Sequence, residues 1–150
     1  MKLFASLKLT GTLLLLLICL FSAPAPAFPQ QDGEFRDGSG NTIGYIKSDG
    51  DIRDRSGNTI GAIKSNGDVR NGSGNSIGTI RSDGEVENGS GNTIGYVKSD
   101  GEVRDAAGNK IGEVTGGGDV RNSSGNTIGS ARGVRPEYAA AFFFFFFKEM

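Results

Sequence analysis

The segment Asp49–Ser65 reads D-G-D-I-R-D-R-S-G-N-T-I-G-A-I-K-S, and its pattern recurs along most of the chain. The motif Gly-Asn-x-Ile-Gly within it returns every 17 residues without an insertion, and six such units tile residues 32–133. The motif begins at Gly40, Gly57, Gly74, Gly91, Gly108 and Gly125. A fixed period of this length indicates a repeat architecture in which each unit buries its apolar side chains against its neighbours.

Each unit carries apolar residues at three places, and turn formers or charged residues stand between them. The first column is Phe35, Ile52, Val69, Val86, Val103 and Val120; the second is Ile43, Ile60, Ile77, Ile94, Ile111 and Ile128; the third is Ile46, Ile63, Ile80, Val97, Val114 and Ala131. Short apolar segments bounded by Gly, Asn, Asp and Ser predict short β-strands, and the same composition excludes helices in the repeats.

Two turns divide each unit into two strands. The segment Ser48–Asp51 lies between two apolar positions, and its Asp-Gly pair predicts a hairpin with a type I′ turn. The segment Ser56–Asn58 predicts a slightly longer loop in which Gly57 supplies a left-handed conformation and Asn58 bonds its own backbone. A glycine inside the second strand, at Gly44 in the first unit, predicts a bulge that brings Ile43 and Ile46 onto one face.

The fold class that follows is all-β, a ring or closed meander of short β-hairpins built from six 17-residue repeats. Five Asp-Gly hairpins are complete, and they centre on Gly50, Gly67, Gly84, Gly101 and the Gly117–Gly118 pair. The sixth is divided between Glu34–Arg36 and Ile128–Ala131, which would form a latch if the ring closes. The alternative is a β-solenoid, in which strand partners are offset by 17 residues instead of being reflected about Gly50.

The repeat and the C-terminal segment G-V-R-P-E-Y-A-A-A-F-F-F-F-F-F together resemble the five-fold β-flower proteins, a family of bacterial proteins. The resemblance covers essentially the whole chain. It implies a ring of β-hairpins with pseudo-five-fold symmetry, in secreted or envelope proteins chiefly of Bacteroidota. It implies no activity and no functional residues. Six motifs here stand against a five-fold name, and the five complete hairpins would reconcile the two counts.

The first 27 residues have the pattern of a signal peptide. Lys2 and Lys8 precede the apolar run Leu13–Phe21, and small residues follow up to Ala27. The run is too short to cross a bilayer as a helix, so we expect cleavage after Ala27 and export to the periplasm, envelope or medium. The expected domains are residues 1–27 as signal peptide, 28–134 as the β-hairpin repeat domain and 135–150 as a hydrophobic poly-Phe tail.

Composition narrows the function classes. The chain has 16 basic and 17 acidic residues, no His and one Cys, and that Cys lies in the predicted signal peptide. Without His or a mature Cys we expect no enzyme and no cofactor, and the near-neutral charge argues against nucleic acid as a partner. The spacing of Asp49, Asp51, Asp54 and Asn58 would suit a hard cation such as calcium, but turns use the same residues.

Two features stand out as candidates for interaction. Tyr45 and Tyr96 occupy the same column in two units, and exposed Tyr could stack on sugars. The other candidates are the residues of the terminal run, Phe142, Phe143, Phe144, Phe145, Phe146 and Phe147. Six consecutive Phe exposed in water would promote aggregation, so we expect the tail either to plug one face of the ring or to dock onto a membrane surface, a partner or a second copy.

From these observations we expect a secreted, non-enzymatic structural or interaction module of the bacterial cell envelope, whose biochemical role and partner the sequence leaves unknown. The alternative is a glycan-binding module that uses an exposed tyrosine face.

Overall fold

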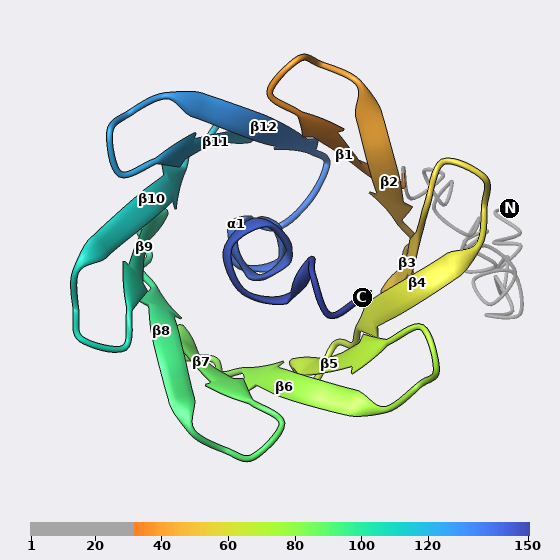
Figure 1. Cartoon of the computed structure of the whole chain (residues 1–150), viewed down its shortest axis with the longest axis horizontal. Helices are drawn as coiled ribbons and strands as arrows, with labels where there is room; N and C mark the ends of the chain where they lie inside the picture. The colour runs from red at the N-terminus through yellow and green to blue at the C-terminus, as the bar shows by residue number, and fades with distance from the viewer. Residues whose placement is uncertain (1–31) are drawn as a thin grey trace, which may run out of the picture.

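Each repeat unit folds into two short antiparallel strands joined by a tight turn, and the strands close into a ring around a C-terminal helix (Figure 1). The computed structural model describes residues 32–150. The strands are β1 (Gly33–Asp37), β2 (Thr42–Ile46), β3 (Asp51–Arg53), β4 (Thr59–Ile63), β5 (Asp68–Asn71), β6 (Ser76–Ile80), β7 (Glu85–Asn88), β8 (Thr93–Val97), β9 (Glu102–Asp105), β10 (Lys110–Val114), β11 (Asp119–Asn122) and β12 (Thr127–Arg132). The helical segments are α1 (Pro136–Ala140) and the π-helix η1 (Ala141–Phe146).

Strand pairing decides between the two predicted folds. Ile46 pairs with Ile52, and Tyr45 pairs with Arg53, so partners are reflected about the turn at Gly50. All neighbouring strands are antiparallel, and all except the closing pair are consecutive in sequence. The hairpin ring is therefore confirmed, and the β-solenoid alternative is wrong.

The predicted latch closes the ring. Strand β1 pairs with β12, with Phe35 opposite Ala131 and Arg36 opposite Ser130. Twelve strands at two per unit make a ring of six units. Five of the six links between units are Asp-Gly turns or their equivalents, and the sixth link is the latch between β1 and β12.

The turns differ from the predicted type. The amide of Gly50 donates to the carbonyl of Lys47 at 2.9 Å, and the amide of Lys47 donates to the carbonyl of Asp51 at 2.8 Å. Gly50 has φ +88°, but among residues 32–150 no residue other than glycine has positive φ. A type I′ turn needs positive φ at Asp49 as well, so the prediction is wrong. The geometry is that of a type I turn followed by a left-handed glycine that forms a bulge.

The second turn of each unit has the same geometry and the same length. Gly57 has φ +87°, its amide donates to the carbonyl of Asp54, and the amide of Asp54 donates to the carbonyl of Asn58. The left-handed glycine is thus confirmed, whereas the longer loop is wrong. Asn58 bonds the carboxylate of Asp54 through its side chain and its amide, instead of bonding its own backbone.

The predicted bulge lies in the second strand of each unit. Phe35 faces Gly44, but Arg36 faces Thr42, so Ile43 has no partner of its own in β1. The same shift recurs in the other units, between β3 and β4, for example. Gly44 therefore points into the barrel together with Ile46, and Ile43 packs half-buried beside the core.

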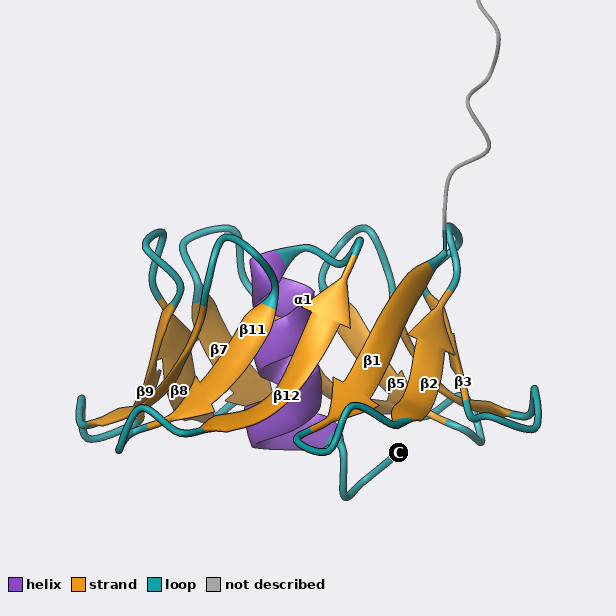
Figure 2. Cartoon of the chain, turned by 90° about the horizontal axis from the view of Figure 1, so that it is seen from above, coloured by secondary structure: helices purple, strands orange, loops and turns teal. Residues whose placement is uncertain are grey.

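The core is a set of apolar rings around the barrel axis. All six residues of the first column are fully buried, and those of the third column are at most 6 % exposed. The helix runs along the axis inside these rings (Figure 2), with its start at the end that carries the Asp-Gly turns, the top rim. The Gly-Asn turns flare outward at the other end, the petal end. No buried polar or charged residue occurs within residues 32–150.

The predicted signal peptide, residues 1–27, lies outside the described residues. Within the described part of the chain, no helix has the length and apolar character needed to cross a membrane.

Candidate functional site

The C-terminal helix enters the barrel directly from the last strand. Gly133, with φ +69°, turns the chain after β12, and Pro136 stands at the start of α1, where its fixed φ suits a helix and its missing amide hydrogen costs nothing. The α-helix becomes a π-helix at Ala141, and the amide of Phe147 donates to the carbonyl of Phe142 at 3.0 Å. We call residues 136–150 the plug.

The plug fits the barrel through a column of glycines, one in each unit. They are the glycines of the bulged strands: Gly44, Gly61, Gly78, Gly95, Gly112 and Gly129. A Cβ atom placed on Gly129 would lie 2.5 Å from Phe143, and one on Gly95 would lie 2.5 Å from Phe145. Real Cβ atoms do not approach other carbons so closely, so these positions hold phenylalanine rings only because they lack a side chain.

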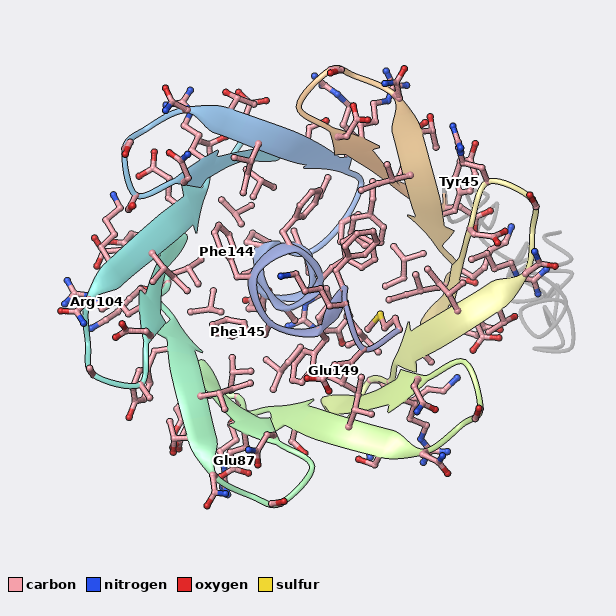
Figure 3. All side chains as sticks on the ribbon, viewed as in Figure 1. Tyr45, Glu87, Arg104, Phe144, Phe145 and Glu149 are labelled. Carbon is pink, nitrogen blue, oxygen red and sulfur yellow. The ribbon has the colours of Figure 1, made fainter. Side chains whose placement is uncertain are left out.

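Consecutive phenylalanines rest on consecutive units. Phe143 packs on Gly129. Each following phenylalanine packs on the glycine of the preceding unit: Phe144 on Gly112, Phe145 on Gly95 and Phe146 on Gly78. Met150 takes the next position, where a Cβ on Gly61 would lie 2.9 Å from its Cγ. Figure 3 shows the rings of Phe144 and Phe145 directed from the helix toward neighbouring strands.

The π-helix suits this arrangement. Six units around a ring lie about 60° apart, whereas successive residues of an α-helix differ by about 100°. The i→i+5 bonding of a π-helix spreads more residues over each turn, so the rotation per residue decreases. The wider turn therefore brings four consecutive side chains closer to the spacing of four consecutive units.

The sixth glycine has a different partner. Phe35 stands where the other units have Ile or Val, and its ring lies 3.9 Å from a Cβ placed on Gly44. It stacks on Phe142, with ring centroids 4.0 Å apart and planes at 7°. Such a pair contributes about 0.5–1.5 kcal/mol beyond the area it buries. The one phenylalanine of the repeats thus packs against the first phenylalanine of the plug.

The structure places the six predicted phenylalanines as a plug. Phe142 and Phe146 are buried, and Phe143, Phe144 and Phe145 are half-buried against the core. Phe147 is 46 % exposed at the petal end, so it alone of the run presents a large free surface. The tail is not a free docking segment in this arrangement.

The two predicted tyrosines lie on the outer wall, and the ring keeps them apart. Tyr45 is 38 % exposed and Tyr96 is 37 % exposed. They lie on β2 and β8, which are three units apart in a closed ring of six and stand on opposite sides of it in Figure 1. No single face contains both side chains.

Charged residues cover the outer wall in ion pairs. Lys64 approaches Asp51 at 2.8 Å, Arg104 approaches Glu102 at 2.6 Å, and Arg81 approaches Glu87 at 2.7 Å. The charged atoms are partly exposed, where such pairs contribute little to stability. Other carboxylates accept hydrogen bonds within the turns, such as that of Asp54. Within residues 32–150, no group of three acidic or thiol side chains could hold a metal ion.

The top rim has open cavities between the Asp-Gly turns and the first turn of the plug. One of about 300 Å³ is lined by Lys47, Lys64 and Tyr138, and another of about 250 Å³ is lined by Arg81, Lys98 and Tyr138. Tyr138 fixes the top of the plug, since its hydroxyl lies 3.4 Å from the carbonyl of Lys64 and its ring lies 4.8 Å from the guanidinium of Arg135.

A family model described as 5-fold beta-flower protein matches residues 32–147, which include all twelve strands and both helical segments. The chain belongs to the 5-fold beta-flower family. Neither the curated proteins nor the solved structures gave a match. This beta-flower protein has six units in its ring although the family is described as five-fold.

The sequence indicates the hydrophobic tail of this beta-flower protein, but it does not indicate the glycines against which the tail packs. The sequence predicts the glycine in each second strand as a bulge residue, and this is confirmed. Its second role, which is to leave room for a side chain of the plug, depends on where the helix lies in the folded ring. One signal in the sequence could have indicated this packing: a run of six phenylalanines follows six units that each keep a glycine inside the second strand.

Proposed function

We propose that this beta-flower protein is a secreted, non-enzymatic structural or interaction module of the bacterial cell envelope. The observation that supports it is the filled lumen: the protein's own plug occupies the place where a barrel would hold a ligand. No polar or charged residue of residues 32–150 is buried as a whole, and the residues buried inside the ring are apolar. Contacts with partners would be made by the outer wall and the rims, which repeat the same side-chain columns around the ring.

The N-terminal pattern supports export. Lys2, Lys8 and the apolar run Leu13–Phe21 have the order of a signal peptide, and the first strand starts at Gly33, soon after the predicted cleavage site at Ala27. Removing residues 1–27 takes two of the 16 basic residues and none of the 17 acidic ones, so 14 basic and 17 acidic residues remain, a net charge of −3.

The test is expression of the full chain in a bacterial host, followed by fractionation and mass measurement. We expect a product that begins at Phe28 and is found outside the cytoplasm. Ala27→Arg should block cleavage and leave a longer, cell-associated product, whereas the control Asp32→Ala should be processed normally. A full-length product that starts at Met1 and stays in the cytoplasm would contradict export.

A glycan-binding module is the second candidate, and the exposure of the two tyrosines favours it. Because they lie on opposite sides of the ring, each would have to stack on a sugar by itself. A glycan array that gives signals for the mature protein and none for Tyr45→Ala/Tyr96→Ala would support this function. A blank array for the unaltered protein would exclude it for the glycans tested.

A further inference from the structure

Each tyrosine is the centre of a charged row that crosses three strands of the outer wall. Tyr45 on β2 pairs with Glu34 on one side and with Arg53 on the other. Directly paired residues of antiparallel strands point to the same face, so these three side chains stand together on the outer wall. Figure 3 shows Tyr45 on the outside of the ring, away from the plug.

The same row occurs once more, three units further along. Tyr96 on β8 pairs with Glu85 and with Arg104. In both rows a threonine hydroxyl donates a hydrogen bond to the glutamate, Thr42 to Glu34 and Thr93 to Glu85. The other four units have Ala62, Thr79, Glu113 and Ser130 in the tyrosine column. Two of six units therefore carry an equivalent Glu-Tyr-Arg row, on opposite walls.

A Glu-Tyr-Arg row is complementary to a second row turned end to end. A two-fold axis along the central strand, placed between two facing walls, puts Tyr against Tyr and sets each Glu opposite an Arg. Neighbouring strands are about 4.8 Å apart, so the opposite charges at the two ends of a row are separated by roughly 10 Å and do not pair with each other. Within the ring, Glu34 pairs with Arg36 at 2.8 Å and Arg104 pairs with Glu102 at 2.6 Å, so the facing copy shares these charges. A two-fold axis along the row would set Glu against Glu, which excludes that arrangement.

We propose that the outer wall binds a second copy of this chain through these two rows, so that rings associate wall to wall. The contact is isologous, with the same patch on both molecules. Because each ring has two such patches on opposite sides, association continues beyond a dimer into linear chains of rings. Tyrosine suits the centre of such a contact, since it adds apolar area with few rotatable bonds.

This inference deepens the proposed function, because it names the partner of the module. The remaining large exposed apolar side chain in residues 32–150 is Phe147, which lies at the petal end beside the turns at Asn41 and Ser56. Association through the tail and association through the rows can therefore be separated by substitution.

The test is sedimentation velocity of the mature protein, residues 28–150, over a wide range of concentration at low and high salt. We expect species larger than a dimer at high concentration, and we expect salt to weaken their association, because the charged residues at the row ends are partly exposed. Tyr45→Ala should stop association at the dimer, since one patch remains, and Tyr45→Ala/Tyr96→Ala should sediment as a monomer. The unit with Ala62 carries Ala at this place naturally, so the fold tolerates it.

Charge exchange tests the direction of the rows. Arg53→Glu/Arg104→Glu and Glu34→Arg/Glu85→Arg should each be monomeric alone and associate with each other in a one-to-one mixture. Arg70→Glu is the matched control, because Arg70 pairs with Ala62 in a row without tyrosine, and it should associate as the unaltered protein does. Circular dichroism confirms that each variant is folded.

A monomer at every concentration would overturn the proposal and leave the export test of the module unaffected. Association that survives the double tyrosine substitution, or that is lost only in Phe147→Ala, would also overturn it. A monomer whose tyrosines bind glycans on the array would assign the rows to sugars instead. Self-association of a chain that is not exported would uphold the rows and reject the envelope role.

Discussion

Gly50 and Gly57 have the same left-handed backbone but different surroundings. Their φ values are +88° and +87°. A Cβ on Gly50 would overlap the carbonyl oxygen of Ile63, whereas a Cβ on Gly57 meets nothing within 4 Å. The top-rim turn thus packs against the next strand, and the petal turn projects into solvent.

Alanine at these two glycines should separate backbone strain from steric overlap. We expect Gly57→Ala to cost about 1–2 kcal/mol of unfolding free energy, the cost of a left-handed non-glycine residue. Gly50→Ala should cost clearly more, because the carbonyl of Ile63 must also move. Chemical denaturation of both variants measures the difference, and equal losses would show that the close approach at Gly50 has no energetic weight.

The petal turns use either aspartate or asparagine at one position, and only the acids titrate. Hydrogen bonds from the side chain and backbone of Asn58 hold the pKa of Asp54 below its usual range, and Asn41 and Asn109 do the same for Asp37 and Asp105. In the other units Asn71, Asn88 and Asn122 accept the equivalent backbone bonds without a charge.

A lowered pKa in the folded state makes stability depend on pH in a defined direction. The contribution of these aspartates is complete above the pKa of the unfolded chain and is lost as the pH falls through the lower folded pKa, so the loss occurs below about pH 4. Asp37→Asn/Asp54→Asn/Asp105→Asn should therefore flatten the dependence of melting temperature on pH in that range. The variant should still fold, because asparagine already serves in three units. An unchanged pH profile would show that the three turns do not contribute.

At the scale of elements, the plug and the bulged strands determine each other's side chains. In five of the six bulged strands the glycine leaves room for one side chain of the plug, and the ring of Phe144 packs on Gly112. The same Cβ position on Gly112 also meets the carbonyl of Arg121, which belongs to the barrel alone. A substitution at Gly112 thus has one cost from the plug and one from the sheet.

A double-mutant cycle separates the two costs. We expect Gly112→Ala to lose more stability in the unaltered protein than in the Phe144→Ala background, with a coupling of about 0.5–3 kcal/mol, as for residues in contact. The control pair is Gly112→Ala with Phe147→Ala, which should be additive because Phe147 is exposed at the petal end. Additivity in the first pair would mean that Phe144 does not occupy the seat.

For the whole molecule, the ring size and the plug are linked. Closure depends on β1 pairing with β12, and four consecutive units seat Phe143 to Phe146. A ring of five units would have a narrower lumen and one glycine seat fewer. The helix would then not fit with all its rings in place.

Removing one unit tests this link. Deletion of residues 66–82 takes out one 17-residue period, including Gly78, and rejoins Ser65 to Asp83 within an intact turn pattern. We expect the shortened protein to keep β-structure by circular dichroism but to expose its tail, which limited proteolysis with mass measurement would detect. A five-unit variant whose tail is as protected as that of the six-unit protein would show that the plug does not select the ring size.

Much of the ring could be predicted because the information is local and repeated six times. The apolar columns, the turn positions and the bulge all follow from residues a few positions apart, and the latch follows from the two incomplete hairpins at the ends of the repeat region. The turn type could not be predicted, because Asp-Gly suits both a type I′ turn and a type I turn with a left-handed glycine. The choice at Asp49 depends on how β2 and β3 pair, which is a property of the ladder.

The sequence by itself determined the 17-residue unit, its two short strands and its two turns, because these depend on residues a few positions apart. The tertiary structure decided for the hairpin ring and against the β-solenoid, because strand pairing and closure join residues from different parts of the chain. Only the tertiary structure decided that the phenylalanine run is a plug and that Tyr45 and Tyr96 face opposite ways. Both results depend on closure: a lumen exists only when β1 meets β12, and the angle between two units is fixed only by the number of units in the ring.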